Sequence, residues 1–123
     1  MFTEKFLEVI GKEGVVSIVS WDENGAHVVN TWNSYLVTRN DDTLLIPAAA
    51  MRKTEKKTQQ NAKVLLTVGS KEVDGRRGPG AGFLMEATAA FLTAGPDFDM
   101  MKEKFSFLTR VLEVTVTSLN QTL

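Results

Sequence analysis

The chain has 123 residues, enough for one domain over residues 1–123, and its formal net charge is −1. That balance lacks the basic excess of a general nucleic-acid binder, while the absence of cysteine, with His27 as the one histidine, excludes disulfides, thiolate chemistry and a histidine-rich metal centre. The N-terminal residues mix acids with apolar side chains, unlike a signal peptide, and no apolar run approaches the roughly 18 residues that span a bilayer. We therefore expect a cytoplasmic protein with no membrane or nucleic-acid partner.

Local patterns in the first half predict one helix and an antiparallel meander. Thr3 is a suitable N-cap for a helix that carries Phe6 and Ile10 at helical spacing. Residues 22–25 form a hairpin signal, and Pro47 is expected to end a strand. The expected strands are residues 15–21, 27–38 and 43–46.

The second half adds an exposed helix and three more strands. Residues 51–61 are good helix formers but include no apolar residue after Met51, so their helix must lie exposed over the barrel. The glycine-rich residues 74–82 predict an irregular loop. The other expected elements are strands over 63–70, 83–93 and 111–118 and a helix that residues 95–97 open. Six strands in this order predict a mainly β fold, a six-stranded antiparallel Greek-key or split barrel.

Any ligand of such a barrel is expected on its outside or between two subunits, because side chains fill the interior of a small closed barrel. The most unusual segment is residues 30–35, where amides and hydroxyls flank Trp32 and Tyr35 inside an expected strand. Two interpretations stay open: a solvated edge strand, or a platform on which Trp32 stacks an aromatic ligand while Asn and Thr groups bind its heteroatoms.

A second candidate is the start of the polar helix. A helix N-terminus offers free N–H groups and partial positive charge, Lys53 adds a full charge, and Thr54 adds a hydroxyl donor. Ala48, Ala49 and Ala50 are small enough for backbone to approach a ligand closely. The basic residues of 52–57 taken alone are more typical of a solvated helix face, but on a helix with nothing apolar to bury they predict a phosphate site. No arrangement of acid, base and nucleophile is evident.

Four motifs stand out together: VNTWNSYL at residues 29–36, MRKTE at 51–55, GPGAGFL at 78–84 and QTL at 121–123. With their spacing, they resemble the small bacterial FMN-binding proteins of the wider pyridoxamine-phosphate-oxidase-like group, nearly end to end. The resemblance implies an FMN-binding split barrel and a homodimer with one FMN per chain near the subunit interface.

The resemblance also implies roles for single residues. Residues 30–34 would lie along the flavin, Lys53 and Thr54 would hold its phosphate, and Leu123 would pack near the partner's flavin. The expected cofactor-binding residues are Asn30, Thr31, Trp32, Asn33, Ser34, Ala48, Ala49, Met51, Lys53, Thr54, Gly80, Phe107 and Leu123. The chain departs from close relatives at two places, with alanines where they carry glycines at 48–50 and Phe107 where they carry tryptophan.

Three functions remain possible at this point. The first is an FMN-binding electron carrier, which the lack of an acid–base pair favours. The second is a flavin-dependent oxidoreductase that uses a nicotinamide or a small amine. The third is a binding module without redox activity. The redox partner is unknown from the sequence.

Overall fold

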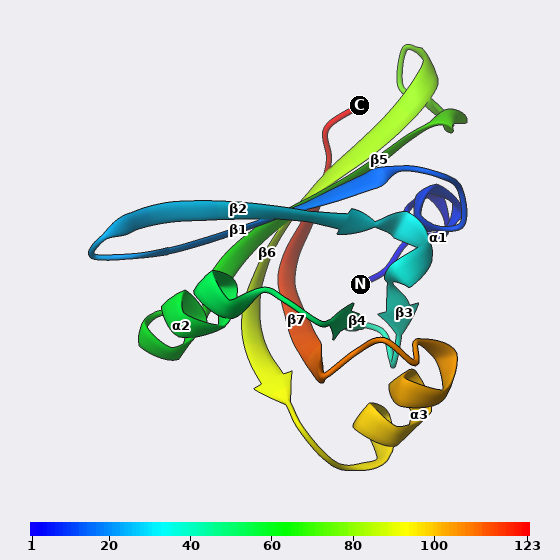
Figure 1. Ribbon diagram of the computed structural model, residues 1–123. Helices are drawn as coiled ribbons and strands as arrows, with labels where there is room; N and C mark the ends of the chain where they lie inside the picture. The colour runs from blue at the N-terminus through cyan, green and yellow to red at the C-terminus, as the bar shows by residue number, and fades with distance from the viewer.

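The structure, a computed structural model, describes residues 1–123. Seven strands form one antiparallel sheet in the order β2-β1-β5-β6-β7-β4-β3 (Figure 1). The strands are β1 Val15–Asp22, β2 Gly25–Trp32, β3 Val37–Thr38, β4 Thr43–Ala48, β5 Lys63–Gly75, β6 Gly78–Leu92 and β7 Arg110–Gln121. The helices are α1 Glu4–Ile10, α2 Arg52–Gln60 and α3 Pro96–Lys104, with a short 3₁₀ helix η1 at Asn33–Tyr35.

The order of the strands explains the barrel. The two edge strands, β2 and β3, are separated in the chain by little more than the three residues of η1. Such a short connection can join the two edges only if the sheet curls until they lie near each other. The predicted mainly β, split-barrel fold is therefore confirmed, with the two ends of the sheet facing each other across a gap.

The core follows from alternation along the strands. Inward-facing residues of β1, β4, β5, β6 and β7 make up most of the main cluster of 19 buried apolar residues. From α1, Phe6 and Val9 add to this cluster, and the Phe6 ring meets Phe83 edge to face at 5.6 Å. The predicted N-cap is confirmed, since the Thr3 hydroxyl accepts a hydrogen bond from the Phe6 N–H.

The other two helices cover the outside of the sheet. As its sequence predicts, α2 buries only Thr54 and Thr58, and it packs against β1, β6 and β2. An ion pair between Lys57 and Asp22, 2.9 Å apart, ties α2 to the β1–β2 hairpin. Met101 of α3 belongs to a second, smaller cluster with Leu45, Leu108 and Val111.

Two predictions about the elements were wrong. The expected strand over 27–38 is broken by η1, which gives β2 and β3 and seven strands instead of six. The expected irregular loop over 74–82 is a hairpin, in which Gly75 pairs with Gly78 across a turn. Glycine is needed there for close approach: a Cβ on Gly75 would lie 2.1 Å from the Gly80 carbonyl oxygen. The hairpin projects beyond the rest of the barrel (Figure 1).

No helix in the structure combines the length and the apolar character needed to cross a membrane.

Candidate functional site

The largest cavity, about 600 Å³, lies between β2 and the segment that connects β4 to α2. That volume falls in the range of small-molecule sites. β2 is one edge of the sheet and β4 lies next to the other, so the two ends of the sheet form the two walls. The lining residues are His27, Val28, Val29, Asn30, Thr31, Trp32, Tyr35, Pro47, Ala49, Ala50, Met51, Arg52, Lys53 and Phe107.

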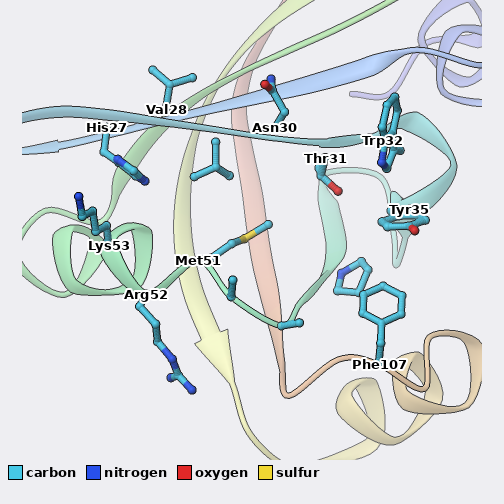
Figure 2. A pocket seen from close by; sticks show the side chains of 14 residues that line it. His27, Val28, Asn30, Thr31, Trp32, Tyr35, Met51, Arg52, Lys53 and Phe107 are labelled. Carbon is cyan, nitrogen blue, oxygen red and sulfur yellow. The ribbon is translucent and has the colours of Figure 1, made fainter.

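The two ends of the cavity differ in chemistry. Figure 2 shows His27 and Lys53 at one end and Tyr35 and Phe107 at the other, with Met51 between them. No carboxylate lines the cavity. The site therefore suits an elongated molecule with an anionic end and an aromatic end.

The β2 wall is set by strand alternation. His27 and Thr31 point to the side of β2 that faces Met51, whereas Val28 and Asn30 point to the other side (Figure 2). The Asn30 amide donates to the Val16 carbonyl at 3.3 Å and to the Ser17 hydroxyl at 3.1 Å, so β1 holds it in place. Thr31 is the buried polar group of this wall, at 6 % exposure.

The opposite wall is a turn whose carbonyl groups are all occupied. The Thr109 N–H donates to the Ala48 carbonyl at 2.9 Å, and the Thr109 hydroxyl lies 3.3 Å from the carbonyls of Ala48 and Ala49. The Arg110 guanidinium donates to the carbonyls of Ala49, at 3.2 Å, and Ala50. Both donors belong to the start of β7 or the residue before it, so the carbonyls of 48–50 are directed toward β7.

The N–H groups of the same segment are free. None of the backbone N–H groups of residues 49–54 has an acceptor within the chain, and the first one engaged is that of Glu55, which donates to the Met51 carbonyl at 2.9 Å. Residues 49–53 line the cavity. A run of free N–H groups that leads into a helix N-terminus carries partial positive charge and is typical of an anion site.

Met51 sets the shape of this run. Its φ is 64° and its ψ is 32°, the left-handed region, and it is the one non-glycine residue with positive φ. This conformation costs an ordinary residue about 1–2 kcal/mol. Backbone strain of this kind concentrates at functional sites. Here it joins the turn to α2 so that the free N–H groups continue into the first turn of the helix.

The charged end of the cavity combines this run with two side chains. Lys53 makes no hydrogen bond or ion pair within the chain and is exposed, so its ammonium group is available to a ligand. Thr54 is fully buried, and its hydroxyl has no partner within the chain. Nearby, the hydrogen bond from Lys57 holds the pKa of Asp22 below its ordinary value, which keeps this carboxylate paired to α2.

The aromatic end is a cluster of three rings. The Tyr35 ring centroid lies 5.3 Å from that of Phe105 and 5.7 Å from that of Phe107. Trp32 stands at the rim of the cavity. Trp32 and Phe107 remain 49 % and 50 % exposed, so each ring offers a face that the chain itself does not cover. Exposed aromatic faces beside a cavity are typical of stacking sites.

The structure brings together seven of the thirteen residues expected to bind a cofactor. Those in the cavity lining are Asn30, Thr31, Trp32, Ala49, Met51, Lys53 and Phe107. Ser34, Ala48 and Thr54 lie next to lining residues but are not part of the lining. Gly80 and Leu123 lie elsewhere, together, near the turn of the β5–β6 hairpin.

Asn33 has a different environment. It is 1 % exposed, and its amide nitrogen lies 3.1 Å from each of the carbonyls of Val9, Lys12 and Gly69. Its amide nitrogen is therefore engaged with α1, the segment after it and β5. The contacts connect η1 to these elements at the point where the chain passes from one edge of the sheet to the other.

Seven lining residues are not among the thirteen expected cofactor-binding residues, although the sequence already pointed to Tyr35 and Ala50 as neighbours of a ligand: His27, Val28, Val29, Tyr35, Pro47, Ala50 and Arg52. For His27 and Val29 a signal existed, since they share the alternating face of a strand with Thr31. No local pattern marks Pro47.

The sequence matches the family described as pyridoxamine 5'-phosphate oxidase over residues 2–123. The chain belongs to this family. The resemblance drawn from the motifs is thereby confirmed. The chain is also 44 % identical to a protein of Nitratidesulfovibrio vulgaris (Miyazaki F) named FMN-binding protein, over the full length of both proteins.

Solved structures show the same fold at low identity. The HupZ protein of Group A Streptococcus matches with a TM-score of 0.80 and 15 % identity over 99 % of this chain and 94 % of that chain. An FMN-binding protein from Syntrophomonas wolfei matches with a TM-score of 0.68 and 18 % identity over 88 % of this chain and 76 % of that chain. These proteins thus share this barrel fold with the chain at low sequence identity.

Proposed function

We propose that this chain binds FMN and acts as a small electron carrier. The observation that carries the proposal is the cavity itself, with free N–H groups and Lys53 at one end and exposed aromatic faces at the other. FMN has a phosphate at one end and a flat aromatic ring at the other. The relative that shares 44 % identity over the whole chain is named for FMN, which supports the same ligand.

The residues present fit this cofactor. Lys53 and the N–H groups that lead into α2 would hold the phosphate. The Thr54 hydroxyl, which has no partner within the chain, would donate a further hydrogen bond there. Thr31 and the 48–50 turn would lie along the ring, whose far end would meet Phe107 and Trp32. When bound, FMN supplies reversible uptake of electrons at its ring.

A carrier role is favoured over an enzyme by what lines the cavity. The titratable side chains there are His27, Tyr35, Arg52 and Lys53. Arg52 pairs with Glu55, which lies outside the lining, and the other three make no hydrogen bond to a carboxylate. General acid–base catalysis requires a proton donor or acceptor held against the reacting atom. The chain itself supplies no such pair at the ring end.

We also propose a homodimer in which the partner completes the site. Phe107, Trp32 and Val28 present exposed apolar surface at the cavity, and Val28 is 56 % exposed. Leu123, at 62 % exposure, lies outside the cavity beside the projecting hairpin, so it can reach an FMN only in a partner subunit. Apolar surface of this kind around a site is typical of an interface.

The test begins with apoprotein titrated separately with FMN, FAD and riboflavin. We expect one FMN per chain, tighter binding of FMN than of riboflavin, and a dimer by sedimentation velocity at micromolar concentration. When the FMN-loaded protein is mixed anaerobically with reduced nicotinamide adenine dinucleotide, the bound flavin should stay oxidised. Rapid bleaching of the flavin would instead support the oxidoreductase alternative. Failure to bind FMN at all would overturn the proposal.

A further inference from the structure

Arg110 is the one charged residue that the barrel buries, at 4 % exposure. Its guanidinium donates to the carbonyls of Ala49 and Ala50, and to the Glu55 carboxylate at 3.1 Å. The same guanidinium lies 5.2 Å from the centre of the Phe91 ring. Its Nε has no partner within the chain. Arg110 therefore joins the first residue of β7 to the turn and the helix that form one wall of the cavity.

Burial raises the free-energy cost of this charge and at the same time strengthens its electric field. Taking a guanidinium out of water carries a desolvation penalty of several kcal/mol, which its hydrogen bonds must offset. In return, water screens its field less than it screens the field of an exposed lysine. A buried cation that contacts only the back of a ligand-site turn, Glu55 and one ring points to a role at that turn.

The nearby charges do not cancel it. Glu55 accepts hydrogen bonds from both Arg110 and Arg52, and the Arg52 side chain is 71 % exposed. Two cations and one carboxylate leave the group with net positive charge. Because Arg52 is exposed to water, the buried and less screened cation of this group is Arg110.

The contacts also orient the peptide dipoles of the wall. With the carbonyls of Ala49 and Ala50 held by Arg110, their oxygens point away from the cavity. The N–H groups of the segment are left without acceptors within the chain, while its residues line the cavity. Cation and dipoles thus act in the same direction and make this wall electropositive.

We propose that Arg110 is a positioning residue that raises the reduction potential of the flavin, through the 48–50 turn and its own charge. The proposal rests on the proposed FMN site. Uptake of two electrons and one proton leaves the uncharged flavin ring with one negative charge. An electropositive wall along the ring therefore favours the reduced form over the oxidised form. Glu55 opposes this effect, since it partly neutralises the cation.

The experiment compares the reduction potentials of FMN-loaded wild type, Arg110→Gln, Arg110→Lys and Glu55→Gln, measured anaerobically against a reference dye. In Arg110→Gln, we expect the affinity for reduced FMN to fall about tenfold more than that for oxidised FMN, which lowers the two-electron potential by about 30 mV. Glu55→Gln should shift the potential upward, and Arg110→Lys should recover most of the loss. Arg39→Gln, which removes an arginine paired to Asp97 and Glu113 away from the cavity, is the matched control.

Opposite shifts in the two charge variants are the decisive result. If Arg110 only braced the turn, Arg110→Gln and Glu55→Gln would both loosen it and would move the potential in the same direction or not at all. That outcome overturns the inference and leaves FMN binding intact. If Arg110→Gln does not fold, as judged by circular dichroism, the direction of the Glu55→Gln shift decides the question: an upward shift supports the inference, and a downward shift or no shift overturns it. If wild type binds no FMN, the proposed function fails and this inference fails with it.

Discussion

Replacing Lys53 by alanine tests the charged end of the cavity. A charge-assisted hydrogen bond contributes about 1.5–3 kcal/mol, and the lower value applies because Lys53 is exposed to water. A loss of about 1.5 kcal/mol weakens binding about tenfold. Binding should not vanish, because the backbone N–H groups of residues 51–54, which lead into α2, remain to hold the phosphate. We therefore expect a tenfold rise in the dissociation constant for FMN, measured by quenching of flavin fluorescence.

Two controls make this loss specific. Riboflavin lacks the phosphate, so Lys53→Ala should leave its affinity unchanged. Lys56→Ala removes the same charge from the same helix, but Lys56 lines a neighbouring depression and not the cavity, so FMN affinity should change much less. Equal losses for FMN and riboflavin would refute the assignment of Lys53 to the phosphate. Unchanged FMN affinity would move the anion site elsewhere, with Arg76 and Arg77, at the turn of the β5–β6 hairpin, as the next candidates.

Three further predictions use other features. Trp32→Ala should increase the fluorescence of bound flavin, because the indole at the rim of the cavity quenches it. Trp21→Phe, outside the cavity, should change the fluorescence little. If Trp21→Phe increases the fluorescence and Trp32→Ala does not, the assignment of the stacking residue to β2 is wrong. The pKa of Asp22 lies below its ordinary value of 3.8, so the ion pair with Lys57 stabilises the fold above pH 3.8, and this contribution is lost as the pH falls further. The melting temperature of the wild type should therefore fall more steeply in acid than that of Asp22→Asn. Gly14→Ala should lower stability by about 1–3 kcal/mol in urea unfolding, because its Cβ would lie 1.9 Å from a backbone oxygen, while Gly11→Ala, at 3.3 Å, should cost much less.

Local chemistry was enough to predict much of the fold. The Thr3 cap, the helix after Met51 with nothing to bury, and the alternation of the core strands all depend on neighbours within a few residues. The same holds for the charged end of the cavity, since free N–H groups belong to any helix N-terminus. These parts needed no knowledge of distant contacts.

The remaining features depend on contacts between distant parts of the chain. No neighbouring residue indicates that the Asn33 amide meets the carbonyls of Val9 and Gly69, so local sequence does not predict this buried environment. Arg110 begins an ordinary strand, and its partners at Ala49 and Ala50 are far upstream. The glycines of 74–82 predict an irregular loop by local pattern alone, whereas in the fold they allow two strands and the C-terminal tail to approach closely.

The position of the cavity at the junction of the two sheet ends has a consequence for folding kinetics. Its walls exist together only after β1 has paired with β5 and β4 with β7, pairings between segments far apart in the chain. Such contacts form slowly, because the entropy of closing long loops is lost first. A ligand that needs both walls binds after the transition state, so FMN should slow unfolding and leave the refolding rate unchanged.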